Sequence, residues 1–103
     1  MKHVLFTLKE CPFDLLDDED HIRAVLIAAA EVAGSELLNI ASAKFDPQGV
    51  TAVALLAESH ISIHTWPELG QAVCDVFTCG EHTKPDLAAL YMIDALCAGD
   101  RVV

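Results

Sequence analysis

A chain of 103 residues is long enough for one domain with a hydrophobic core, but too short to enclose a sizeable ligand alone. Its 53% hydrophobic content excludes a disordered chain, and its 21% charged residues favour a surface partly covered by a partner. The formal charge of -10 disfavours nucleic acid and anionic membranes and favours a small cationic ligand. We therefore expect a homo-oligomer, with no nucleic acid or membrane partner.

The start of the chain has no signal-peptide pattern, because the apolar run 4–8 is broken by Lys9 and Glu10. No apolar run approaches the length of a membrane span. We expect a cytoplasmic protein, in which thiols are reduced and a catalytic or buried thiol is favoured over a disulfide. The cysteines concerned are Cys11, Cys74, Cys79 and Cys97.

In the first part of the chain, residues 3–8 predict a strand and residues 11–16 a loop. The acidic run 17–20 predicts a solvated helix start, where carboxylates meet the positive end of the helix dipole. Apolar residues then recur at helical spacing from Ile22 to Ala33, and Gly34 is a natural end. The sequence thus predicts a first helix that ends at about residue 33.

The second part of the chain predicts more strands and one helix. Residues 37–45 and 50–57 predict a hairpin around the Asp-Pro-Gln-Gly turn at 46–49, and residues 60–65 and 71–78 predict two more strands. Thr83 and Asp86 have the spacing of a capping box, which predicts a helix over about 84–98 with Thr83 as N-cap and Gly99 at its end. Residues 100–103 predict a short edge strand.

This order of elements predicts an α+β fold. Helices separated by turn-linked strands favour a two-layer sandwich, with two helices on one face of a mainly antiparallel sheet. The other sheet face then needs cover, and we expect a second copy to supply it by dimerising through the sheets.

The most informative stretch runs from Phe45 to Gly80. It contains Phe-Asp-Pro-Gln-Gly-Val-Thr at 45–51, Ala-Glu-Ser-His-Ile-Ser-Ile-His-Thr-Trp-Pro-Glu at 57–68 and Asp-Val-Phe-Thr-Cys-Gly at 75–80. These blocks and their spacing resemble the bacterial and archaeal pyruvoyl-dependent S-adenosylmethionine decarboxylase proenzymes. The resemblance is tight over about a third of the chain and general in layout elsewhere.

The resemblance implies a single domain, 1–103, that cleaves itself between Glu58 and Ser59 into chains 1–58 and 59–103. The Ser59 hydroxyl would attack the Glu58 carbonyl, the resulting ester would eliminate, and the dehydroalanine left behind would hydrolyse to a covalent pyruvoyl group. That carbonyl would form a Schiff base with S-adenosylmethionine and act as the electron sink for its decarboxylation. The product is the aminopropyl donor for spermidine synthesis.

The resemblance also implies roles for individual residues, in sites at a homodimer interface. His64 matches the processing histidine, and a strand that carries it directly after Ser59 favours proton transfer during elimination. Cys79 matches the cysteine that donates a proton to the substrate α-carbon. The expected substrate-binding residues are Phe45, Trp66 and Glu68. Phe45 would stack on the adenine with help from His64, and Glu68 would accept hydrogen bonds from the ribose hydroxyls.

One motif departs from the family pattern. This chain has Gly49-Val50-Thr51-Ala52 where Gly-Val-Ser-Gly is usual in the family. Thr51 keeps the hydroxyl that assists processing, but its side chain has fewer χ1 rotamers than that of serine. Ala52 cannot adopt every backbone conformation that glycine can. Two alternatives stay open: a relative retuned to decarboxylate arginine or ornithine, and an uncleaved, non-catalytic partner subunit.

Several of these side chains also have structural interpretations. His60 and His64 could be hydrogen-bonded strand histidines, and together with Cys79 and His82 they could imitate a zinc site. The spacing lacks the paired pattern of zinc ligands, so we expect no metal. Cys74 and Cys97 are expected in the core.

Overall fold

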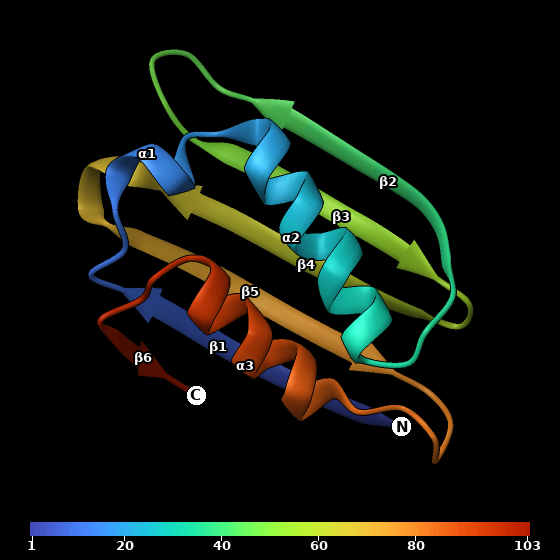
Figure 1. Ribbon diagram of the computed structural model, residues 1–103. Helices are drawn as coiled ribbons and strands as arrows, with labels where there is room; N and C mark the ends of the chain where they lie inside the picture. Colours follow the sequence, from blue (N-terminus) through green and yellow to red (C-terminus); the bar gives the residue numbers. More distant parts are fainter.

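The computed structural model describes residues 1–103 and contains one six-stranded antiparallel sheet with the order β2-β3-β4-β5-β1-β6 (Figure 1). The strands are β1 Lys2–Lys9, β2 Leu37–Lys44, β3 Val50–Leu56, β4 Ser59–Trp66, β5 Gln71–Thr78 and β6 Asp100–Val102. The helices are α1 Phe13–Leu16, α2 Glu19–Val32 and α3 Pro85–Ala95, and a 3-10 turn, η1, spans Pro67–Leu69.

Both long helices lie on one face of the sheet (Figure 1). Helix α2 packs on β2, β3 and β4, while α3 packs on β1, β5 and α2. Burial alternates along β4, where Ile61 and Ile63 are fully buried and His64 is exposed. The predicted α+β fold, with two helices on one sheet face, is confirmed, and the opposite face carries the partly exposed side chains of the strands.

The hydrophobic core lies between the helices and the sheet. Helix α2 contributes Ile22 and Leu26 and α3 contributes Met92, against Ile61 and Ile63 of β4, and none of these side chains is exposed. Asp18 caps α2, because its side chain accepts a hydrogen bond from the His21 N–H (3.0 Å). The acidic run therefore starts the helix as the sequence predicts.

The prediction of a loop over residues 11–16 is wrong. A four-residue helix, α1, occupies Phe13–Leu16, and Leu16 is fully buried. Its carbonyl accepts a hydrogen bond from Thr65 Oγ1 (2.9 Å), which fixes α1 to the end of β4. So short a helix is stabilised by its tertiary contacts and leaves no periodic signal in the sequence.

The predicted capping role of Thr83 is also wrong. The N-cap of α3 is Lys84, and Thr83 is buried with its Oγ1 donating to Gly80 O (2.7 Å). The Thr83 hydroxyl thus closes the connection from β5 to α3. Helix α3 ends earlier than predicted, and Cys97 beyond it is exposed rather than in the core, whereas Cys74 is buried as expected.

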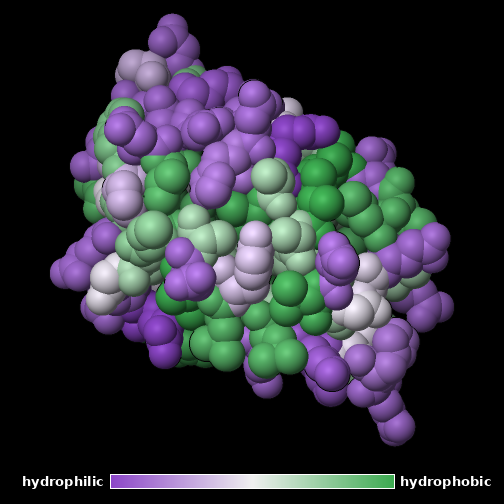
Figure 2. Space-filling view, viewed as in Figure 1, coloured by the Kyte–Doolittle hydropathy of each residue, from purple (hydrophilic) through white to green (hydrophobic).

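Apolar surface is present on the helix side as well as on the open sheet face. Figure 2 shows an apolar band across the helix-covered side, and Ile27 of α2 and Leu87 and Leu90 of α3 are among the exposed large side chains. Leu5 and Leu55 are exposed on the sheet. Exposed apolar area alone therefore does not identify which face would bind a second copy. None of the helices is long and apolar enough to span a membrane.

Candidate active site

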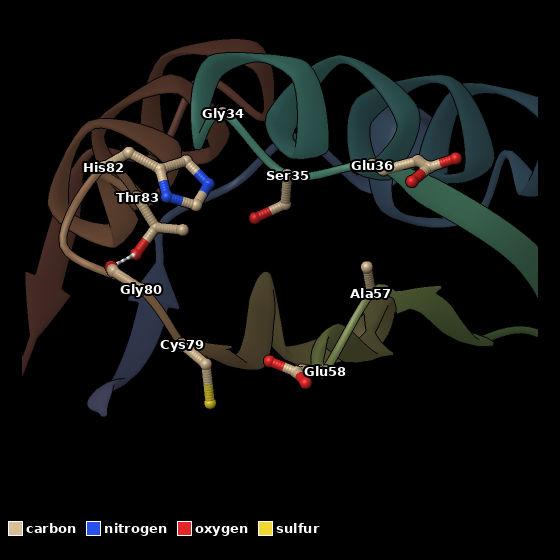
Figure 3. A pocket seen from close by; sticks show the side chains of 9 residues that line it. All are labelled: Gly34, Ser35, Glu36, Ala57, Glu58, Cys79, Gly80, His82 and Thr83. Carbon is tan, nitrogen blue, oxygen red and sulfur yellow. Dashed lines mark hydrogen bonds between the residues drawn. The ribbon is translucent and has the colours of Figure 1, made fainter.

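Ser59 and Cys79 meet at one end of the sheet. The turn between β3 and β4, the connection from β5 to α3 and the connection from α2 to β2 surround a cavity of about 430 Å³ there (Figure 3). The Cys79 N–H donates a hydrogen bond to Ser59 Oγ (3.2 Å). Figure 3 shows the Cys79 thiol pointing away from the helices. The half-buried Ser59 therefore lies where a group made from it could reach a ligand.

The expected substrate-binding residues meet at the other end of β3 and β4. A hollow of about 370 Å³ is lined by Phe45, Gln48, Gly49, Thr51, His64, Thr65, Trp66 and Glu68. Thr51 Oγ1 lies 3.1 Å from His64 Nδ1, and the rings of His64 and Trp66 are tilted with centroids 6.5 Å apart. Phe45 and Trp66 are 50% and 42% exposed, so their faces are available to a ligand.

The two groups of residues are separated within one chain. Ser59 begins β4 and pairs with Leu56, whereas His64 pairs with Thr51 five residues further along. This spacing corresponds to about 16 Å along the strand. The structure therefore does not place His64 beside Ser59 in the same chain, contrary to the sequence argument that the strand itself brings them close.

The departure at Thr51 and Ala52 is accommodated by the structure. The Thr51 hydroxyl keeps a polar partner, His64, across the β3–β4 ladder. Ala52 is 1% exposed and lies in regular strand without a positive φ, a conformation that needs no glycine. The motif change thus leaves both the hydroxyl and the backbone of the site intact.

Comparison with known proteins identifies the family. A sequence profile of the family described as S-adenosylmethionine decarboxylase matches residues 2–103. The S-adenosylmethionine decarboxylase proenzyme of Synechococcus sp. (strain WH7803) is 54% identical over 97 residues, which cover 94% of this chain and 76% of that protein. The chain belongs to the S-adenosylmethionine decarboxylase family.

Other members of the family are similar over most of their length. The proenzyme of Methanococcus maripaludis (strain S2) is 54% identical over 85 residues, covering 82% of this chain and 70% of the relative. The crystal structure of the Aquifex aeolicus VF5 adenosylmethionine decarboxylase is 39% identical, with a TM-score of 0.90 over 97% of this chain and 82% of that chain. The fold described above is therefore shared with a solved decarboxylase.

Sequence reasoning missed Asp17, which supports the hollow of this family member. The Gly49 N–H donates to Asp17 Oδ1 (2.9 Å), and Lys44 Nζ lies 3.0 Å from the same atom. The Gly49 hydrogen bond and the Lys44 ammonium lower the pKa of Asp17. Asp17 thereby fixes the turn that carries Phe45, a role that the acidic run alone did not reveal.

A second group missed from the sequence is the cluster of His3, His60, Ser62 and Asp75 on the open sheet face. His3 Nε2 and His60 Nε2 each lie 2.8 Å from Asp75 Oδ2, and Ser62 Oγ donates to Asp75 Oδ1. Burial raises the pKa of Asp75, but the hydrogen bonds from Ser62, His3 and His60 outweigh it and the net pKa is lowered. The alternating pattern of the sequence places His60 and Ser62 on one face of their strand, but it does not reveal that Asp75 of β5 is their carboxylate partner.

The residues of the zinc alternative do not come together. His60 lies in the Asp75 cluster and His64 in the hollow with Thr51, whereas Cys79 and His82 line the cavity at the other end of the sheet. The ligand-type atoms of His3, His60 and Asp75 lie within 4.8 Å of one another, and both histidines hydrogen-bond to the Asp75 carboxylate.

Proposed function

We propose that this chain is a proenzyme that cleaves itself between Glu58 and Ser59 and then decarboxylates S-adenosylmethionine. Besides family membership, the observation that carries the proposal is the hollow that brings Phe45, Trp66 and Glu68 together from separate segments. Aromatic faces suit an adenine ring, and a carboxylate suits the two ribose hydroxyls. The net charge of -10 favours a substrate with a sulfonium and an amine.

The complete site is proposed to form between two copies. The Ser59 and Cys79 end and the His64 end lie about 16 Å apart along β4, farther than side chains reach. A two-fold dimer through the open sheet faces would set the Ser59 end of one copy against the hollow of the other, giving two identical sites. The exposed Leu5, Leu55 and Val73 on that face would then be buried.

The cleavage step uses the chain's own groups. Ser59 Oγ attacks the Glu58 carbonyl carbon, the Glu58–Ser59 C–N bond breaks, and the hydroxyl proton passes to the freed nitrogen. The resulting ester loses the Glu58 carboxylate as a base removes the Ser59 α-proton, and hydrolysis of the dehydroalanine releases ammonia. The Cys79 N–H fixes the Ser59 hydroxyl at 3.2 Å, and His64 of the second copy, oriented by Thr51, is the proposed proton carrier.

The remaining residues act in turnover. A pyruvoyl group made from Ser59 supplies the electron sink for loss of carbon dioxide. Ser59 is half-buried beside Cys79, which lines the cavity, and this position fits such a group. Cys79 would return a proton to the α-carbon, while Phe45, Trp66 and Glu68 of the second copy hold the nucleoside. This thiol chemistry suits the cytoplasm, and all four cysteines are free.

The proposal is tested by release of carbon dioxide from S-adenosylmethionine, arginine and ornithine, each offered separately. We expect release from S-adenosylmethionine alone, because the other two have no adenine or ribose for Phe45 and Glu68 to bind. Ser59→Ala is the inactive control. A Phe45→Ala variant should raise the KM for S-adenosylmethionine by about tenfold. Release from arginine or ornithine at comparable rates would contradict the substrate assignment, and no release from any of the three would contradict the enzyme.

A further inference from the structure

The residue on the carbonyl side of the proposed scissile bond has an unusual backbone conformation. Leu56 and Ser59 are paired across the β3–β4 hairpin, so Ala57 and Glu58 form a two-residue turn. Within this turn only Glu58 has a positive φ, of 59°. Glu58 therefore adopts the left-handed conformation that turns usually reserve for glycine or asparagine.

This conformation is unfavourable for glutamate. In the left-handed region the Cβ atom crowds the following carbonyl oxygen, and glycine avoids this contact because it has no Cβ. Asparagine tolerates the region through local hydrogen bonds of its short side chain, which the longer glutamate does not make as readily. The Glu58 carboxylate has no hydrogen bond in the structure that offsets this cost (Figure 3).

The turn is held in place from three sides. The pairing of Leu56 with Ser59 closes it, the Ala57 N–H donates to Glu36 O (3.1 Å) and the Cys79 N–H donates to Ser59 Oγ (3.2 Å). The last two contacts come from segments outside the hairpin. A strained residue persists when its surroundings determine its conformation in this way.

We propose that the left-handed Glu58 stores backbone strain that is released when the Glu58–Ser59 bond is cut, which makes Glu58 a positioning residue for self-cleavage. The inference rests on the proposed function. Transfer of the Glu58 acyl group from the Ser59 nitrogen to Ser59 Oγ lengthens the link between the two residues, and elimination of this ester then leaves Glu58 as a chain end. The Leu56–Ser59 pairing no longer constrains that chain end, so the Glu58 backbone can return to an extended conformation. The strain thus raises the free energy of the uncut chain relative to that of the ester and the cut chain that follow attack by Ser59.

The test compares substitutions that remove the strain with one that keeps it. Glu58→Gly and Glu58→Asn relieve the left-handed conformation, whereas Glu58→Ala retains it and also lacks the carboxylate. Ala57→Gly is the matched control, because it adds the same chain flexibility at the neighbouring position, which has no positive φ. Each full-length chain is made by pulse-labelled cell-free synthesis, and the uncut fraction is followed by intact mass.

We expect Glu58→Gly to cut about five- to tenfold more slowly than the parent chain. Glu58→Ala should cut faster than Glu58→Gly, and Ala57→Gly should remain within about twofold of the parent. In the uncut Ser59→Ala background, Glu58→Gly should raise the melting temperature relative to Ala57→Gly, because only the former removes strain from the folded state.

Each alternative outcome has a distinct meaning. If the parent is cut and Glu58→Gly is cut at the same rate, the strain proposal is wrong and self-cleavage stands. If Glu58→Ala is as slow as Glu58→Gly, the carboxylate rather than the backbone acts, and the strain proposal is again wrong. If the parent itself is never cut, both proposals fail.

Discussion

Mixing two inactive chains tests whether the site is shared between copies. Ser59→Ala removes the proposed nucleophile, and His64→Ala removes the proposed proton carrier. A dimer of either variant alone has two defective sites. In a mixed dimer, one site carries both substitutions and is defective. The other site is intact, because it takes Ser59 from the His64→Ala chain and His64 from the Ser59→Ala chain.

The expected magnitude follows from the strand geometry. Because Ser59 and His64 lie about 16 Å apart on β4, the proposed site needs residues from both copies. Random pairing makes about half of the dimers mixed, and each mixed dimer has one intact site of two. The unfractionated co-expressed protein should therefore release carbon dioxide at about a quarter of the parental rate, and isolated mixed dimers at about half of it, although each chain is inactive alone.

The assay uses co-expressed chains with different affinity tags, so that mixed dimers are isolated in two steps. Intact mass adds a second readout, because only the His64→Ala chain retains Ser59 and should be cut. A mixture of Ser59→Ala with Cys79→Ala is the matched control: these residues lie at the same end of one chain, so no site in that mixture is intact. Activity no higher than that of the separate variants, or cleavage of His64→Ala alone, would refute the shared site.

Three further predictions concern single residues. Cys79→Ala should still be cut, because the main-chain N–H contacts Ser59 Oγ, but should release carbon dioxide about 10²- to 10⁴-fold more slowly, as measured on the same sample. Asp17→Asn should raise the KM for S-adenosylmethionine about two- to fivefold in steady-state kinetics, because it weakens the support of Gly49 and Lys44. Asp75→Asn should lower the free energy of unfolding by about 1–2 kcal/mol at pH 7 in urea titrations, a value reduced for the partial exposure of the cluster. The pKa of Asp75 is lowered in the fold, so its contribution is full above the ordinary value of 3.8 and is lost as the pH falls through the folded value.

Each of these predictions has a clear contrary result. An uncut Cys79→Ala chain would mean that the thiol takes part in cleavage. An unchanged KM in Asp17→Asn would show that the Phe45 turn needs no support from Asp17. A stability difference between parent and Asp75→Asn that does not shrink below about pH 4 would contradict the assigned ionisation.

The strands could be predicted from the sequence because local signals define them, and the motif spacing selected candidate site residues. Alternation marks β4, where Ile61 and Ile63 face the helices, and the Asp-Pro-Gln-Gly turn marks the hairpin of β2 and β3. The motif spacing selected Phe45, Trp66 and Glu68, which the structure brings into one hollow. These features depend on neighbours close in the chain or on a recognisable motif.

Features that depend on tertiary contacts could not be predicted in the same way. His3 reaches Asp75 only because β1 pairs with β5, which is distant in sequence. The Thr83 hydroxyl bonds to Thr78 and Gly80 rather than capping a helix, because Thr83 is buried beside the end of β5. The separation of Ser59 and His64 follows from the length of one strand, which a list of motif residues does not convey.

Intact mass spectrometry of the purified protein tests self-cleavage without any assumption about the substrate. We expect two chains, 1–58 and 59–103, with the second beginning in a pyruvoyl group in place of serine, and a single uncut chain for Ser59→Ala. A parent protein that remains one chain of 103 residues, or one cut at another bond, would contradict it.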